Sequence, residues 1–328
     1  MKFLYFTDTH YRGTNPVNRL DDFPLTLENK TREIFQIAKE ENVDYILHGG
    51  DLFDRPDTSI SVASTFAKIF MESPCPIYII SGNHDIYGHN PETVNRTMLG
   101  FLCDLGIMNL LDNKRILLRG DVNVQISGSP YKYGIDEKDN IKSYMVDEVD
   151  NEADYSIHLV HGFLMEKPFI EGINFTLISD IFDTKADITL CGHYHLGFKT
   201  VVHDGKYFIN PGSIIRISNS VLEMKRKPKI LIIELKDKIS IKEIYLKSAQ
   251  SGELVLDRSQ IENSKSKRSK AIEFEDIINT GTSLSFEKRD VFKIINDIAN
   301  KENIPKDVKD ETLRRVTEAQ MGVKNWSI

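Results

Sequence analysis

Five short blocks of aspartate, asparagine and histidine stand out in this sequence, because these residue types bind divalent metal ions. In chain order the blocks are Asp8-x-His10, Gly50-Asp51-x-x-Asp54, Gly82-Asn83-His84-Asp85, His161-Gly162 and Gly192-His193-x-His195. Carboxylate and amide oxygens combined with imidazole nitrogens suit a pair of divalent cations. Two ions about 3.5–4 Å apart need a bridging ligand. Asp51 is the expected bridge, because Gly49-Gly50 before it lets the backbone approach closely.

Taken singly, each block has an ordinary explanation. An Asp-x-His pair usually forms a surface turn, and Gly-Asn-His-Asp is a favourable turn sequence. The histidines outside the blocks are expected to be packing or surface residues, and these are His48, His89, His158 and His203. Five of the nine histidines nevertheless fall within the blocks, which favours a metal site over chance placement.

Each block follows an apolar run of the kind that forms a buried strand. The runs cover residues 3–7, 43–47, 76–80, 156–160 and 188–191. Helices are expected from about residue 26, over residues 59–71 and over residues 92–105. The apolar stripe of the last helix consists of Val94, Met98, Phe101, Leu102 and Leu105. Alternating strands and helices favour a largely parallel sheet, which binds ligands beyond the carboxyl ends of its strands. The five blocks should therefore meet at one site.

The rest of the chain is expected to be richer in strands and then to change character. Strands are expected over residues 122–127 and 207–209, and a hairpin over residues 229–235 and 239–246. Apolar content falls over residues 248–270, which predicts a linker. Two helical apolar stripes follow, formed by Val291, Ile294, Ile295 and Ile298 and, after Pro305, by Val308, Leu313 and Val316. We therefore expect a catalytic domain at 1–247, a linker at 248–270 and a small helical region at 271–328.

Composition narrows the classes of function. The chain has 328 residues, 40% of them hydrophobic and 28% charged, which is a globular balance. It has no apolar run of about 20 residues that could cross a membrane, and its first apolar run is too short for a signal peptide. Three cysteines without CxxC spacing predict a reducing, cytoplasmic location. The net charge of −7 argues against holding nucleic acid by a basic surface alone, although a nuclease can gain affinity from a partner.

In this order, the five blocks resemble the pattern of the calcineurin-like metallophosphoesterase superfamily. The resemblance implies an α/β (α+β) fold with a two-layer β-sandwich core flanked by helices. It implies two metal sites that share one residue: Asp8, His10, Asp51 and His195 at the first, and Asp51, Asn83, His161 and His193 at the second. It also implies that His84 contacts the scissile phosphate and that Asp85 orients His84.

Details around the blocks are similar to SbcD-type DNA repair and recombination nuclease subunits of phage and bacterial type. These details are Arg55-Pro56 after the second block, Asp85 where related phosphatases have Glu, and the loop Asn210-Pro211-Gly212-Ser213. The resemblance implies a Mn²⁺-dependent DNA exonuclease or endonuclease that works with an SbcC-like coiled-coil ATPase. Arg12 and Arg19 are candidate phosphate contacts, although exposed arginines usually have no such specific role.

The same resemblance implies a homodimer formed through the helices after the second and third blocks. The candidate contact residues are Phe66, Phe70, Met98, Phe101 and Leu102, and core packing explains each of them equally well.

Two other functions compete with the nuclease. One is a stand-alone phosphodiesterase or phosphatase that acts on nucleotides or other small phosphoesters. The other is a catalytically silent scaffold, which the complete ligand set disfavours. The C-terminal helical region favours the nuclease over the stand-alone enzyme, because a small-molecule enzyme has no evident need for it.

Overall fold

The computed structural model describes residues 1–169, 173–259, 299–300, 304–306, 308–309 and 312–313. The chain divides into two compact units, residues 1–258 and residues 259–328. The stripe predicted at 291–298 and most of the helical region predicted at 271–328 lie outside the described residues. No helix among the described residues is long and apolar enough to span a membrane.

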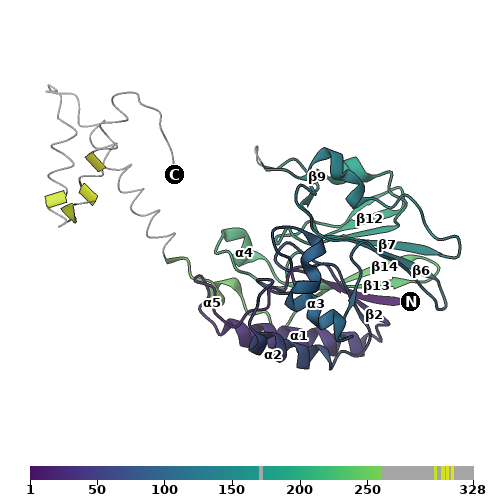
Figure 1. Ribbon diagram of the computed structural model, residues 1–328, viewed down its shortest axis with the longest axis horizontal. Coiled ribbons are helices and arrows are strands. Elements are labelled where there is room, and N and C mark those ends of the chain that lie inside the picture. Colours follow the sequence, from purple (N-terminus) through teal and green to yellow (C-terminus); the bar gives the residue numbers. More distant parts are fainter. Residues whose placement is uncertain (170–172, 260–298, 301–303, 307, 310–311, 314–328) are drawn as a thin grey trace, which may run out of the picture. The chain divides into compact units, whose positions relative to one another are not determined.

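Two six-stranded sheets form the centre of the first unit (Figure 1). Sheet I has the order β14-β13-β1-β2-β3-β4 and consists of β1 (Lys2–Phe6), β2 (Tyr45–His48), β3 (Ile77–Ile79), β4 (Asn109–Leu110), β13 (Lys229–Leu235) and β14 (Ile239–Tyr245). Sheet II has the order β11-β12-β10-β7-β6-β5 and consists of β5 (Arg115–Leu118), β6 (Val124–Ser129), β7 (Tyr155–Val160), β10 (Ile188–Cys191), β11 (Val201–His203) and β12 (Lys206–Ile209). A small parallel pair joins β8 (Leu164–Met165) to β9 (Thr176–Leu177).

The parallel strands lie in the middle of each sheet. Strands β1 to β4 run parallel to one another, as do β6, β7, β10 and β12. The predicted hairpin is confirmed as β13 and β14, and β13 pairs antiparallel with β1. Each sheet therefore gathers the carboxyl ends of several strands at one edge, as the sequence predicted.

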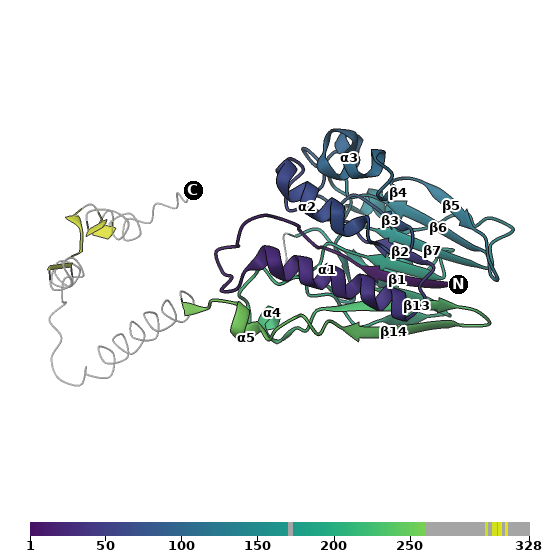
Figure 2. The same ribbon diagram turned by 90° about the horizontal axis from the view of Figure 1, so that it is seen from below.

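Three apolar layers hold the sheets and helices together. The inner layer, between the sheets, includes Phe3 and Leu47 of sheet I and Ile157 of sheet II. The outer face of sheet I packs on α1 (Phe23–Glu40), α2 (Ile60–Phe70) and α3 (Met98–Asp104), which Figure 2 views from outside. The outer face of sheet II packs on the 3-10 helices η2 (Lys138–Tyr144) and η3 (Ile178–Ile181). The predicted two-layer sandwich flanked by helices is confirmed.

Local capping moves two helix starts away from the positions that the apolar stripes predicted. Helix α1 begins at Phe23 rather than near Thr26, because the Asp22 side chain accepts a hydrogen bond from the Leu25 backbone N–H and Pro24 fits the first turn. The helix predicted over 92–105 is interrupted at Thr97, whose hydroxyl accepts a hydrogen bond from the Gly100 backbone N–H. The 3-10 helix η1 (Pro91–Arg96) precedes this cap and α3 follows it.

The same interruption changes which side chains face the core. Leu99 and Leu102 are buried, whereas Phe101 and Leu105 of the predicted stripe are 52% and 59% exposed. Because the helix restarts at Thr97, its register differs from that of a continuous helix.

Two short helices lie near the end of the first unit, α4 (Val221–Lys225) and α5 (Gly252–Val255). Val255 and Leu256 are buried, although the sequence assigned residues 248–270 to a linker. The backbone N–H of Leu20 donates to the carbonyl oxygen of Val255, and that of Asp257 donates to Asn18. Residues 248–258 are therefore packed chain rather than linker, and residues 260–270 lie outside the described part.

Candidate metal centre

The five predicted blocks come together where the carboxyl ends of five parallel strands meet. The first three blocks follow β1, β2 and β3 of sheet I, and the last two follow β7 and β10 of sheet II. Their side chains form three groups in which the possible ligand atoms all lie within 4.8 Å of one another, and two of these groups share Asp51.

The first group consists of Asp8, His10, Asp51 and His195. The Nε2 atoms of His10 and His195 lie 3.0 Å apart. His10 Nε2 is 3.6 Å from Asp51 Oδ2, and His195 Nε2 is 3.6 Å from Asp8 Oδ1. Two carboxylates and two imidazoles thus direct donor atoms at one point.

The second group consists of Asp51, His161 and His193, and the Asn83 side chain lies beside it. His161 Nε2 is 3.3 Å from Asp51 Oδ2 and 3.2 Å from Asn83 Oδ1. The same Asn83 oxygen lies 2.9 Å from His193 Nδ1. The Nδ1 atom of His161 lies 2.7 Å from the carbonyl oxygen of Gly49, which fixes the ring with Nε2 toward the centre.

Asp51 belongs to both groups, and the charges around it keep it ionised. Although burial acts to raise the pKa of Asp51, the positive charge and hydrogen bond of His161 hold it well below its usual range. Burial lowers the pKa of His10 well below its usual value and that of His193 to about 3, so both imidazoles are neutral at pH 7. Neutral imidazoles have the free lone pair that a metal ligand requires.

These residues fit a pair of divalent cations. Hard carboxylate and amide oxygens face imidazole nitrogens, among them the neutral rings of His10 and His193, and one carboxylate is common to the first two groups. This candidate dimetal site of histidine and aspartate is typical of calcineurin-like phosphoesterases.

The backbone at the centre is strained in a way that points these side chains inward. Asp8, His10, Asp51 and His193 all have φ between 44° and 71°, in the left-handed region. Such a conformation costs a non-glycine residue about 1–3 kcal/mol and is common at functional sites. Gly50 adopts φ 97°, and a Cβ atom there would lie 2.5 Å from His161 Nδ1. The glycine beside Asp51 is therefore required for close approach, as the sequence predicted.

His84 lies beside the first group, with its ring centroid 4.6 Å from that of His10. Its Nδ1 atom lies 2.8 Å from the backbone carbonyl oxygen of Asp54. This bond corrects the role expected for Asp85, because Asp54 and not Asp85 orients the His84 ring. The Asp85 carboxylate instead accepts hydrogen bonds from the backbone N–H groups of Leu52, Phe53 and Gly82.

Asp85 therefore ties the loop after β2 to the loop after β3. Its burial, together with the charge of Asp51, raises its pKa to about 7. Asp54 belongs to the second predicted block, but the sequence assigned it no role at the centre. It forms a third group with His10 and His84, and its carboxylate lies 3.1 Å from the Arg12 guanidinium.

The two candidate phosphate contacts lie in different surroundings. Arg12 is partly exposed, and its ion pair with Asp54 holds it beside the centre. Arg19 is buried, forms a two-pronged ion pair with Asp21 at 2.7 and 2.6 Å, and donates to the Arg216 carbonyl oxygen. This geometry gives Arg19 a structural role in place of the expected phosphate contact.

A loop that sequence reasoning noted, but did not connect to the ligands, supports the centre. The Ser213 hydroxyl donates to the Asp8 carbonyl oxygen at 2.7 Å, and the Ile214 backbone N–H donates to Thr7. Basic side chains hold the loop in turn: Lys30 Nζ donates to the Ile214 carbonyl oxygen at 2.6 Å, and Arg226 donates to those of Ser213 and Ile215. The available sequence signal was the polar Lys30 between Leu27 and Ile34 on the apolar face of α1.

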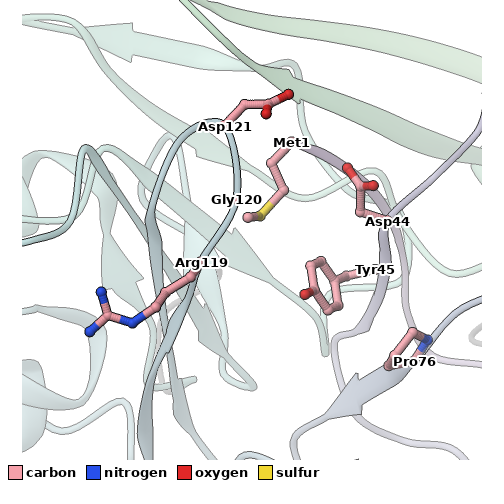
Figure 3. Close-up of a pocket in the computed structure, with 7 residues that line it drawn as sticks. All are labelled: Met1, Asp44, Tyr45, Pro76, Arg119, Gly120 and Asp121. Atoms are coloured by element: carbon pink, nitrogen blue, oxygen red, sulfur yellow. The ribbon is translucent and has the colours of Figure 1, made fainter.

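Two cavities near the sheets differ in their relation to the centre. One of about 350 Å³ lies at the amino ends of β1 to β3, and Figure 3 shows Met1, Asp44 and Tyr45 around it with Arg119 pointing away. It is at the opposite end of these strands from the metal ligands. Another of about 340 Å³ adjoins the centre, because His193 forms part of its wall.

Comparison with known proteins gives the same family that the five metal-binding blocks resemble. The family model of calcineurin-like phosphoesterases matches residues 1–197. The chain is 26% identical over 302 residues to double-strand break repair protein MRE11 of Encephalitozoon cuniculi, covering 80% of this chain and 50% of that protein. It is 24% identical over 326 residues to double-strand break repair protein mre-11 of Caenorhabditis elegans, covering 79% and 43%. The chain thus spans half or less of these two relatives.

A solved structure gives independent support for the fold. A dimetal phosphatase from Danio rerio superposes with a TM-score of 0.51 over 74% of this chain and 95% of that chain, at 11% identity. At this identity the likeness shows the fold alone.

Proposed function

This chain belongs to the calcineurin-like phosphoesterase family, and from that premise we propose that it is a Mn²⁺-dependent DNA phosphodiesterase, the nuclease subunit of an SbcCD-like repair and recombination complex. The observation that carries the proposal is the likeness to MRE11 proteins over about 80% of the chain, because it extends beyond the residues that the phosphoesterase model matches. A general phosphatase would have no reason to be similar to repair nucleases over that extra length.

In the proposed site, Asp8, His10, Asp51 and His195 hold one ion. Asp51, Asn83, His161 and His193 hold the other. When bound, two such cations supply the Lewis acidity that activates a phosphoester and its water nucleophile. The two carboxylates among these residues carry two formal negative charges, so a site loaded with two divalent ions is net positive and attracts a phosphodiester anion.

We assign His84 to the substrate rather than to the metals. Its Nδ1 is bonded to the Asp54 carbonyl oxygen, so this nitrogen carries a proton and Nε2 is free for another partner. A protonated His84 can donate from Nε2 to a phosphoryl oxygen as negative charge develops, or hand the proton to the leaving oxygen. Arg12, held beside the centre by Asp54, is the remaining candidate for a second phosphate contact.

The proposed partners are DNA, an SbcC-like ATPase and a second copy of the chain. For the dimer, the structure removes three of the five candidate contact residues, because Phe66, Phe70 and Leu102 are fully packed in the core. Phe101 is 52% exposed on α3 and remains available for such a contact. We propose that the ATPase docks on the C-terminal helical region, most of which lies outside the described residues.

The test is hydrolysis of end-labelled single- and double-stranded oligonucleotides by the purified full chain, with and without Mn²⁺. We expect Mn²⁺-dependent cleavage that disappears in Asp51→Asn and persists in a control, His203→Gln, which changes a half-buried histidine of β11 outside the centre. Turnover of a small phosphomonoester without cleavage of either DNA would favour the stand-alone enzyme and overturn the proposal.

A further inference from the structure

An aromatic cavity adjoins the proposed second metal position. Its wall includes His193 together with Tyr131, Tyr133, Phe163 and His89. The Tyr131 ring lies 5.5 Å from the His193 ring, centroid to centroid, and the Phe163 ring lies 5.8 Å from it. A group bonded to a phosphate at the metal centre would therefore lie directly beside these rings.

The cavity is built on fixed backbone. The Tyr131 backbone N–H donates to the Ser81 carbonyl oxygen, and that of Tyr133 donates to His89, both at 3.0 Å. The Phe163 backbone N–H donates to the Asp136 carboxylate. These bonds tie the aromatic residues to the same loops, after β3 and β7, that carry Asn83 and His161, so the rings and the proposed ligands keep one geometry.

Exposure and charge indicate what the cavity can take. Tyr133 is 78% exposed and Ile173, at the cavity edge, is 46% exposed, although large apolar side chains usually pack. Asp136 and Glu137 contribute negative charge to the wall, which disfavours a phosphate there. Flat aromatic faces with an acidic edge suit a planar, uncharged ring that carries amino groups.

We infer that this cavity is a stacking site for one nucleobase, the base of a nucleotide whose phosphate is bound at the metal centre, with Tyr131 as a main stacking face. The inference rests on the proposed phosphodiesterase function and adds a position that selects the substrate. Stacking of a base on an aromatic side chain contributes about 1–3 kcal/mol, so loss of the base or of the Tyr131 ring should reduce kcat/KM about 5- to 150-fold.

Three diesters test the stacking site: d(ApA), d(ApA) without its 5′ base, and d(ApA) without its 3′ base. The two abasic diesters cover both orientations in which the substrate could bind. In the wild-type protein we expect one of the two abasic diesters to be hydrolysed with a kcat/KM at least fivefold below that of d(ApA). Tyr131→Leu should lower kcat/KM for d(ApA) at least fivefold more than it lowers kcat/KM for that abasic diester. Tyr131→Phe, which keeps the ring, should retain the preference, and so should the control Tyr245→Leu on β14.

A binding measurement makes the result independent of turnover. A diester of a 2-aminopurine nucleotide and an abasic nucleotide is fluorescent in solution. Stacking of the 2-aminopurine ring on Tyr131 should quench this fluorescence in the wild-type protein and in Tyr131→Phe, but not in Tyr131→Leu. Equal kcat/KM for all three diesters, without quenching, would overturn the stacking site. The proposed phosphodiesterase function would still stand. If no diester or DNA is cleaved, the proposed function fails, and quenching alone then supports or overturns the stacking site.

Discussion

The Nδ1 atom of His84 lies 2.8 Å from the backbone carbonyl oxygen of Asp54. A carbonyl oxygen only accepts, so this contact places a proton on Nδ1 and directs the other ring nitrogen away from Asp54. It also links the loop after β2 to the loop after β3, beside the bonds that Asp85 makes to Leu52 and Phe53. His84 is thus held by backbone and not by a second acidic side chain.

Replacing His84 by alanine should separate catalysis from metal binding. Positioned proton transfer contributes about 10²- to 10⁴-fold to a rate, so we expect hydrolysis of DNA and of a small diester to fall by that order in His84→Ala. Both metal ions should stay bound, because His84 lies beside the proposed ligands. Elemental analysis of the dialysed variant, with His203→Ala as control, decides the point, and loss of an ion would make His84 a ligand.

Asp51 and Asp8 should differ in their effect on metal content. Asp51 Oδ2 lies within 3.6 Å of His10 Nε2 and 3.3 Å of His161 Nε2, so it belongs to both groups, whereas Asp8 belongs to one. Calorimetric titration with Mn²⁺ should therefore show weakened binding of both ions in Asp51→Asn and of one ion in Asp8→Asn. The same residual stoichiometry in the two variants would contradict a bridging Asp51.

The ligand blocks could be predicted from sequence because their signal is local. Asp8, Asp51 and Asn83 each follow a short apolar run, and the rule that parallel strands end at one edge then brings them together. The support of the centre could not be predicted in this way. The contact from Lys30 to Ile214 joins residues 184 apart, and the carbonyl oxygen that orients His84 belongs to the backbone, which has no residue-type signature.

Two expectations about site residues changed, and both came from the family resemblance. The resemblance implied that Asp85 orients His84, and it made Arg19 a candidate phosphate contact. Folding instead brings backbone N–H groups to Asp85 and brings Asp21 to Arg19. Which polar partner is nearest depends on the packing of distant loops, so residue type and spacing alone do not determine it.

Arg226→Lys should destabilise the loop behind Asp8. The Arg226 guanidinium donates to the carbonyl oxygens of Ser213 and Ile215 and pairs with Glu223 at 2.9 Å, and a lysine cannot satisfy these partners together. We expect the free energy of unfolding in urea to fall by about 1–3 kcal/mol. Arg119→Lys, which changes an exposed arginine paired with Glu152, is the matched control and should change it little. An equal effect of the two variants would contradict the support role.

Stability at acid pH should depend on His158. The Ser127 hydroxyl lies 2.9 Å from its Nδ1 and the Ser143 carbonyl oxygen 3.0 Å from its Nε2, and burial lowers its pKa from 6.5 to about 4. Between these values the unfolded chain binds a proton that the folded chain does not. The contribution of neutral His158 to the free energy of unfolding is therefore complete above about pH 6.5. It declines as the pH falls and is smaller by about 3 kcal/mol at pH 4.

Urea unfolding of the metal-free protein at pH 7 and pH 4.5 measures this effect. His158→Gln keeps a donor and an acceptor without titrating, so it should lose less unfolding free energy between the two pH values than the wild-type protein. His203→Gln on β11 should behave like the wild type. An unchanged pH dependence in His158→Gln would show that this histidine does not contribute.

Removal of residues 259–328 should separate chemistry from partner binding. All the proposed ligands lie between Asp8 and His195, and the described sheets end at Tyr245, within the first compact unit. A chain ending at Arg258 should therefore hydrolyse a small chromogenic diester within about twofold of the full rate, since the groups that perform the chemistry are unchanged. It should no longer capture an SbcC-like ATPase in a pull-down, if the C-terminal unit carries the docking helices. Equal capture by the full and shortened chains would contradict docking by this unit, and a shortened chain that fails to fold would indicate instead that the apolar side chains after residue 258 stabilise the catalytic unit.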